Sequence, residues 1–177
     1  GVAGVGHLLT VGVLTPQGAT ATYKWLRSDT SGGTYLPING ASLSTYTLTT
    51  DDYNKYIKVE ATGSGSYSGT VTSAYMGPIV KGQITAIGSI IGTTTVGETL
   101  TAGVLTPVAA TADYQWQRLV GGTWTNISGA TANTYTLTGD DLGTYVRVVA
   151  TGNGYYTGSA TVGTISVITG TQTPITA

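Results

Sequence analysis

The 177-residue sequence contains no cysteine and only one histidine, His7. Without cysteine there is no disulfide and no thiol chemistry. Zinc sites are built from several cysteine or histidine ligands, and a Ser-His-Asp triad needs a positioned histidine. His7 has Glu98 as its counterpart in the repeat described below, so the two halves share no histidine chemistry. These absences argue against an enzyme of these classes, and we expect no cofactor.

Charge is scarce as well. Charged residues make up 8% of the chain, and the formal net charge is −1. Nucleic acid is not an expected partner, because its phosphates call for clustered lysine and arginine. No apolar run approaches the roughly 18 residues of a membrane-spanning helix, so we expect no membrane insertion. Phenylalanine is absent, whereas threonine, glycine and tyrosine are abundant. This uncharged polar composition favours an extracellular or cell-surface protein.

Most of the sequence is an internal repeat. "TYTLTTDDYNKYIKVEATGSGSY" at residues 45–67 returns as "TYTLTGDDLGTYVRVVATGNGYY" at residues 134–156. The tryptophan segments and the segments ending in "GVLTP" also recur, so the repeat spans nearly the whole sequence. A repeated unit of this size suits two small domains better than one large one. We place them at residues 1–81 and 82–177.

Within each half, apolar and polar residues alternate. Ile57, Val59 and Ala61 are apolar, the residues between them are charged, and the counterparts in the second half keep the same parity. A strand with one buried face requires this pattern. Turn-forming glycine, asparagine and aspartate separate the runs, and no helical period persists. The pattern predicts an all-β fold, with about seven antiparallel strands per half arranged as a β-sandwich.

A tryptophan in the third strand, a "TYTLT" strand and an Asp-x-x-x-Tyr pattern resemble an immunoglobulin-like domain. More narrowly, the pattern is similar to tandem immunoglobulin-like repeats of bacterial and archaeal surface-layer and adhesin proteins. The resemblance implies two tandem immunoglobulin-like antiparallel β-sandwiches, with the tryptophans in the core and a "tyrosine corner" whose hydroxyl bonds back to nearby backbone. The structural residues expected on this basis are Trp25, Trp116, Tyr56, Tyr145, Asp52 and Asp141.

The sequence departs from antibody domains at the cysteines that bridge their two sheets. Arg147 stands two residues after Tyr145, where such a cysteine would lie, and its counterpart in the first half is Lys58. The apolar parity points both side chains outward. The family is also broad, since its members bind, space or assemble, and the fold does not choose among these roles.

Each half carries an Asp-Asp pair, and these pairs raise the question of calcium. Ca²⁺ takes 6–8 oxygen ligands, whereas the whole chain has only eight acidic residues. We therefore expect Asp52 and Asp141 to hold a turn by accepting hydrogen bonds from backbone N–H groups. No metal site is expected.

Aromatic side chains leave a second interpretation open, a carbohydrate-binding surface. The ligand contacts in that case are Tyr67, Tyr155, Tyr156 and Trp124. The competing explanation is that the tyrosines cover the ends of the sandwiches. Asn126, in "NIS", matches an N-glycosylation sequon.

We interpret the chain as a non-enzymatic structural protein of an extracellular or cell-surface assembly, such as a filament, a surface layer or a stalk. The alternative is an adhesin or carbohydrate-binding module that uses its Tyr-rich hairpins.

The ends of the sequence bear on assembly. Residues 83–100 open the second half, but the first half has only residues 1–8 before the shared segment, so its first strand is incomplete. "TPITA" at residues 173–177 repeats the start of that strand. Two explanations stay open. Residues 171–177 belong to a following module of a longer array, or they complete the first domain of another copy, which would give a head-to-tail homopolymer by strand donation.

Overall fold

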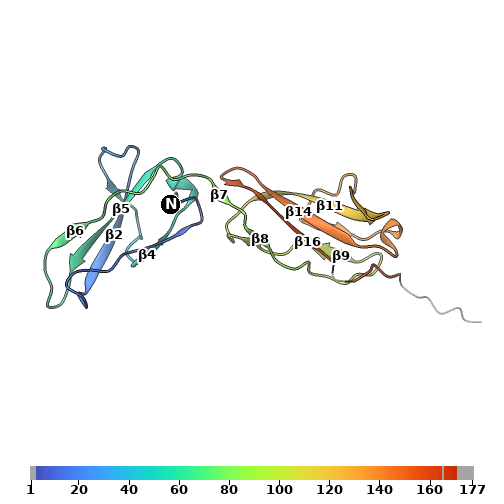
Figure 1. Cartoon of the computed structure of the whole chain (residues 1–177), viewed down its shortest axis with the longest axis horizontal. Coiled ribbons are helices and arrows are strands. Elements are labelled where there is room, and N and C mark those ends of the chain that lie inside the picture. The colour runs from blue at the N-terminus through green and yellow to red at the C-terminus, as the bar shows by residue number, and fades with distance from the viewer. Residues whose placement is uncertain (1–2, 165, 171–177) are drawn as a thin grey trace, which may run out of the picture. The chain divides into compact units, whose positions relative to one another are not determined.

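The computed structural model describes residues 3–164 and 166–170, and it divides into two compact units, Gly1–Gly82 and Gln83–Ala177 (Figure 1). The division falls one residue from the expected boundary between 81 and 82. The described part of each unit consists of strands and one 3₁₀ turn. The expected all-β fold is therefore confirmed. Among the described residues, no helix has the length and apolarity needed to cross a membrane.

Unit 1 (residues 1–82) is built from a four-stranded and a two-stranded sheet. The smaller sheet pairs β1 with β4 antiparallel, and Leu9 lies opposite Tyr46. The larger sheet is also antiparallel and has the order β3-β2-β5-β6. The elements are β1 (Leu8–Thr10), β2 (Ala21–Ser28), β3 (Leu36–Pro37), β4 (Thr45–Thr47), the turn η1 (Thr50–Asp52), β5 (Tyr56–Gly63) and β6 (Thr70–Thr72).

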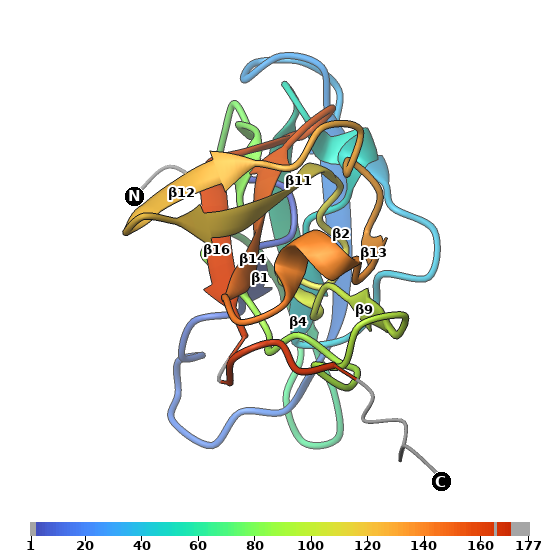
Figure 2. The same cartoon turned by 90° about the vertical axis from the view of Figure 1, so that its right-hand side faces the viewer.

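Unit 2 (residues 83–177) repeats this plan and adds to it. Its four-stranded sheet has the antiparallel order β12-β11-β14-β16 (Figure 2), and β9 pairs with β13 as β1 pairs with β4. A further short strand, β8, pairs with β10. The elements are β8 (Ala86–Ile87), β9 (Thr99–Thr101), β10 (Leu105–Thr106), β11 (Ala112–Val120), β12 (Thr123–Asn126), β13 (Thr134–Thr136), the turn η2 (Gly139–Asp141), β14 (Val146–Gly152), β15 (Tyr156–Thr157) and β16 (Ser159–Gly163); β7 (Gly82–Gln83) lies at the boundary.

The two tryptophans lie in the cores, between the sheets of their units. Trp25 on β2 is 4% exposed and Trp116 on β11 is fully buried. Each ring lies 5.6 Å, centroid to centroid, from a tyrosine of the smaller sheet, Tyr46 or Tyr135. Each indole N–H donates to a backbone carbonyl, at 2.9 Å in unit 1 and 3.0 Å in unit 2. The tryptophans thus fill the space between the layers without leaving a polar group unpaired.

The strand pattern explains the rest of the packing. Val146 and Val148 on β14 are fully buried and alternate with partly exposed residues. In unit 2 they join Leu100, Leu137 and Ile168 around Trp116. Isoleucines that precede β9 also pack against this cluster, namely Ile87 and Ile90. The first half of the sequence has no counterparts of these two isoleucines, and this difference shapes the candidate site.

Candidate functional site

A buried carboxylate holds the turn before the long central strand in each unit. Asp141, at the end of η2, has no exposed surface. Its Oδ2 accepts from the Thr138 backbone N–H at 2.7 Å, the Thr138 hydroxyl at 3.1 Å and the Tyr135 hydroxyl at 2.7 Å. Its Oδ1 accepts from Arg118 Nε at 2.7 Å. Four donors therefore surround one carboxylate.

Unit 1 has the same arrangement around Asp52. The Thr49 N–H donates at 2.7 Å, the Tyr46 hydroxyl at 2.8 Å and Arg27 Nη1 at 3.1 Å. Both aspartates therefore accept hydrogen bonds from backbone N–H groups at a turn. Each carboxylate is saturated by protein donors, and the described residues contain no group of three or more His, Cys, Asp or Glu side chains able to hold a metal ion.

The electrostatics of this cluster fit a structural role. Burial alone would raise the pKa of Asp141, but hydrogen bonds from Arg118, the Thr138 N–H and Tyr135 outweigh it and lower the pKa. Burial, together with the hydrogen bond to Asp52, raises the pKa of Tyr46 to about 12. Tyr135 shifts in the same direction for the same reasons. At neutral pH the unit 2 cluster therefore holds an ionised Asp141, a neutral Tyr135 and a charged Arg118.

The predicted core positions of Tyr56 and Tyr145 are wrong. Tyr56 and Tyr145 were expected in the core as corner residues, but Tyr56 is only partly buried and Tyr145 is 36% exposed. Their neighbours Ile57 and Val146 face inward, and alternation turns the tyrosines away from the core. The hydroxyl that reaches the buried aspartate comes from Tyr46 or Tyr135. Arg27 and Arg118, which complete the cluster, were not predicted.

The aromatic residues considered for carbohydrate binding lie in different environments. Tyr156 is 3% exposed, which contradicts its expected role as a ligand contact, whereas Tyr155 is 45% exposed. Trp124 lies under the Arg147 guanidinium, whose carbon is 4.5 Å from the ring centroid. Lys58 lies over Tyr35 in the same way at 4.1 Å. The stacked pair recurs at one position of both units, as a structural feature of the outer sheet face would.

Asn126, the sequon residue, is exposed on β12. Its side-chain oxygen accepts a hydrogen bond from Gln117 Nε2 at 2.7 Å. The residue is thus on the surface, in a strand rather than a loop.

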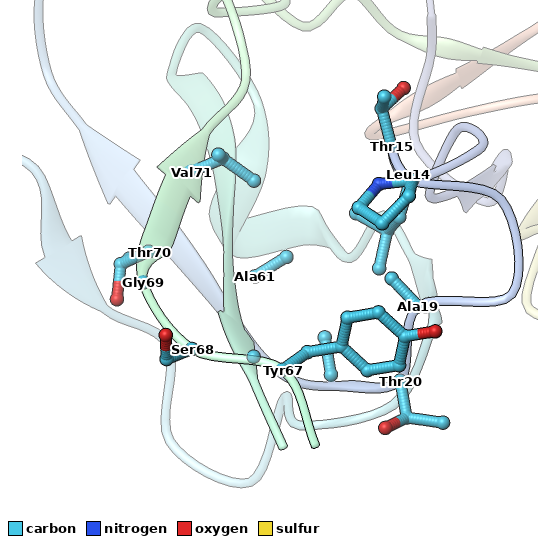
Figure 3. Close-up of a pocket in the computed structure, with 13 residues that line it drawn as sticks. Leu14, Thr15, Ala19, Thr20, Ala61, Tyr67, Ser68, Gly69, Thr70 and Val71 are labelled. Carbon is cyan, nitrogen blue, oxygen red and sulfur yellow. The ribbon is translucent and has the colours of Figure 1, made fainter. Parts of the chain in front are cut away.

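Tyr67, the remaining aromatic candidate, lines a hollow in unit 1. This hollow has a volume of about 170 Å³, and no charged residue lines it. In Figure 3 the Tyr67 ring extends toward Leu14 and Ala19, with Ala61 and Val71 on the far side. A second hollow of about 470 Å³ lies over Trp25, between the β1 segment and residues 73–76, and His7 is on its rim. We call these two hollows together the open face of unit 1.

In unit 2 the chain's own residues 84–91 lie at the equivalent place, and a hollow of about 420 Å³ remains beside Ile90. The Ile84 N–H donates to Thr157 O at 2.9 Å, the Thr85 N–H to Thr106 O at 2.9 Å, and the Gly88 N–H to Val104 O at 2.8 Å. Ile91 and Thr101 exchange two hydrogen bonds, at 2.8 and 2.9 Å. The unit 1 counterparts of these backbone partners are Ser68, Thr15, Val13 and Thr10, and they are exposed, as Thr157, Thr106 and Val104 also are in unit 2.

Two pairs of glycines at matching repeat positions show the same difference between the units. A Cβ on Gly103 would lie 2.2 Å from Gly88 O, whereas one on its counterpart Gly12 would meet nothing within 4 Å. A Cβ on Gly158 would lie 3.2 Å from both Gln83 Cγ and Ile84 O, whereas one on its counterpart Gly69 would meet nothing within 4 Å. The open space beside Gly12 and Gly69 in unit 1 therefore corresponds to the place that residues 83–88 occupy in unit 2.

Comparisons with known proteins give limited guidance. A family model described as "Domain of unknown function (DUF8696)" matches residues 86–169, which lie within unit 2 and make up less than half of the chain. Among solved structures, the chain is similar to one titled "Structure of amphioxus IgVJ-C2 molecule", with 19% sequence identity, a TM-score of 0.35, and coverage of 96% of this chain and 98% of that chain. A search among curated proteins found no match. These likenesses assign neither a family nor a function to this chain.

Proposed function

We propose that the protein is a non-enzymatic structural component of an extracellular or cell-surface assembly, such as a filament, a surface layer or a stalk. In this proposal the two units are tandem immunoglobulin-like sandwiches, and copies of the chain associate head to tail by strand donation. The observation that carries the proposal is the open face of unit 1, where two hollows and the open space beside Gly12 and Gly69 lie at the place that residues 84–91 occupy in unit 2.

Physical chemistry favours a covering partner for such a face. Exposed strand edges present N–H and C=O groups that pair readily with another strand, and native proteins pair or cover them. A head-to-tail contact of this kind is heterologous, so it gives an open polymer unless the rotation between successive copies closes a ring. In both units the buried aspartate accepts its hydrogen bonds from arginine and tyrosine side chains of the same unit, which fits a structural role.

The adhesin alternative gains no support from the aromatic residues. Tyr156 is buried, and Trp124 has one ring face occupied by Arg147. A sugar-binding platform needs exposed ring faces that converge on one surface.

The proposal is tested by analytical ultracentrifugation of the purified chain over a wide concentration range, with negative-stain electron microscopy of the same samples. Antibody labelling of intact cells tests the location. We expect mass to increase with concentration, linear polymers on the grids, and labelling of unpermeabilised cells. A monomer at every concentration, or labelling only after permeabilisation, would overturn the proposal.

A further inference from the structure

We infer that the open face of unit 1 is an acceptor site for one β-strand with the sequence character of residues 83–91, and that its smaller hollow selects the isoleucine of that strand that corresponds to Ile84. The occupant is the C-terminal segment 171–177 of a second copy of the chain, with Ile175 as its anchor. The source of the strand rests on the proposed function, whereas the acceptor site itself rests on the geometry of unit 1.

The backbone part of the site consists of two edges. In unit 2, residues 84–91 bond to Thr157 on one side and to residues 101–106 on the other. The same two edges exist in unit 1, at Ser68 and at residues 10–15, where a Cβ on Gly12 or on Gly69 would meet nothing within 4 Å. A strand that enters between them gains the hydrogen bonds that residues 84–91 make in unit 2. Main-chain bonds of this kind supply affinity in strand addition, and side-chain pockets supply register.

The side-chain part of the site is apolar. Ile84 is 2% exposed in unit 2, and Tyr156 beside it is 3% exposed. Their surroundings correspond to the hollow lined by Tyr67, where no isoleucine is present and the tyrosine is only partly buried. Ile90 packs against the unit 2 core and lines a hollow of about 420 Å³, which overlaps the counterpart of the larger hollow over Trp25. The smaller hollow of unit 1 thus matches the place of Ile84 in unit 2, whereas a hollow remains in both units at the place of the larger one.

The sequence of the chain identifies the donor. Ile84-Thr85-Ala86 recurs as Ile175-Thr176-Ala177, at the same separation that relates Gly12 to Gly103. Residues 171–177 lie outside the described residues, so the assignment uses their sequence alone. Aligned on unit 2, residues 171–177 correspond to residues 80–86, so in this proposal Ile175 takes the place of Ile84 at the smaller hollow and Ala177 takes the place of Ala86, which pairs with Thr106. The places of Gly88 and Ile91 lie beyond this segment, and the peptide of the first experiment reaches them.

The first experiment tests the acceptor with a synthetic peptide of residues 83–92, QITAIGSIIG, added to the 177-residue chain. Calorimetry should show saturable binding, and hydrogen exchange should slow at Thr10, because the N–H of its counterpart Thr101 donates to Ile91 O. A peptide with Ile84→Asp should bind roughly 10- to 100-fold more weakly, because it places a charge in the apolar hollow.

Two chain variants make this test specific. Gly12→Ala should fold normally but lose peptide binding, because a Cβ at the counterpart position lies 2.2 Å from the strand backbone. Gly32→Ala is the matched control, since a Cβ there also meets nothing within 4 Å and Gly32 is not part of either hollow. Unchanged binding by Gly12→Ala, or exchange protection confined to unit 2, would overturn the acceptor site.

The second experiment tests the source of the strand. Ile175→Asp and a chain ending at residue 170 should both lose concentration-dependent association, and both should still bind the peptide. Association that persists in both variants would overturn the C-terminal segment as the donor while leaving the proposed self-association in place. Peptide binding by a wild-type chain that stays monomeric would overturn the proposed function and the donor, but not the acceptor site.

Discussion

Replacing Asp141 with asparagine tests whether the buried carboxylate clusters hold the units together. The substitution keeps the size and shape of the side chain but removes its charge and turns one acceptor oxygen into an N–H₂ donor. Asp141 has no exposed surface, and its two oxygens accept from four donors. The new N–H₂ group must therefore face Arg118 on one side, or Thr138 and Tyr135 on the other.

The magnitude follows from what is left unpaired. Breaking one partner of a buried ion pair costs about 3–5 kcal/mol, and a hydrogen bond to a charged group contributes about 1.5–3 kcal/mol. The Arg118 side chain is 20% exposed, so water can recover part of its solvation. We therefore expect Asp141→Asn to lower the free energy of unfolding of unit 2 by about 3 kcal/mol, a large share of the roughly 5–15 kcal/mol available to a small domain.

The neighbouring residue supplies a matched control. Asp140 is 84% exposed, and its carboxylate lies 3.7 Å from Arg118 Nη1. Exposed ion pairs of this kind contribute at most about 1 kcal/mol, so Asp140→Asn should have little effect.

The assay is urea unfolding of the full-length chain, read by hydrogen exchange and mass spectrometry, so that peptides of unit 2 are separated from those of unit 1. Unit 1 then acts as an internal reference in every sample. If Asp141→Asn is no more destabilising than Asp140→Asn, the carboxylate cluster is not what stabilises unit 2, and our account of it is wrong.

Three further outcomes are expected. Trp116→Ala should lower the unfolding free energy of unit 2 by about 3–5 kcal/mol, measured by urea titration, because it removes a fully buried indole. Added Ca²⁺ should leave the melting temperatures of both units unchanged in a thermal-shift assay, and a saturable increase would contradict a purely structural role for the aspartates. The folded-state pKa of Tyr46 is raised from 10.0 to about 12. The contribution of its neutral hydroxyl to the stability of unit 1 should therefore be complete below pH 10 and lost as pH rises through 12. Absorbance at alkaline pH should show this late ionisation, and Tyr46→Phe should reduce its amplitude, leaving the part that comes from Tyr135.

Acid stability of unit 2 should depend on Asp141 with the opposite sign. Its folded-state pKa lies below the ordinary value of 3.8, so the carboxylate contributes fully above that value and less as pH falls below it. Asp141→Asn should therefore flatten the acid limb of the unfolding curve of unit 2, and an unchanged acid limb would contradict the lowered pKa.

Local sequence pattern predicted the strands well because each strand buries one face. Alternation placed Ile57, Val59 and Ala61 inward, and all three are buried. The same alternation, applied one residue earlier, turns Tyr56 outward, and the resemblance to immunoglobulin-like domains led to the opposite assignment. Here the physical pattern was the better guide than the family pattern.

The carboxylate clusters could be foreseen only in part. Asp141 accepts a hydrogen bond from the backbone N–H of Thr138, three residues earlier, so turn chemistry predicts that contact from the sequence. Arg118 reaches Asp141 across 23 residues, from β11 to the end of η2. Such a contact depends on how the sheets stack, which alternation does not encode. The signal that was available is that both Arg27 and Arg118 stand two residues after a core tryptophan.

The open face of unit 1 could not be recognised from either source alone. Sequence comparison of the halves shows that residues 83–91 lack counterparts, but not that they fill a space between two strand edges. The structure of unit 1 shows hollows, but not what shape of strand fits them. Gly12 and Gly103 join the two observations, because one residue type at one repeat position has open space in unit 1 and a backbone oxygen 2.2 Å from its Cβ position in unit 2. A glycine at position 12 has no steric function within unit 1, yet its counterpart in unit 2 is required for a strand to pass. If the open face receives a strand that extends to the place of Gly88, Gly12 has the same function as Gly103, and Gly12→Ala separates that function from the folding of unit 1.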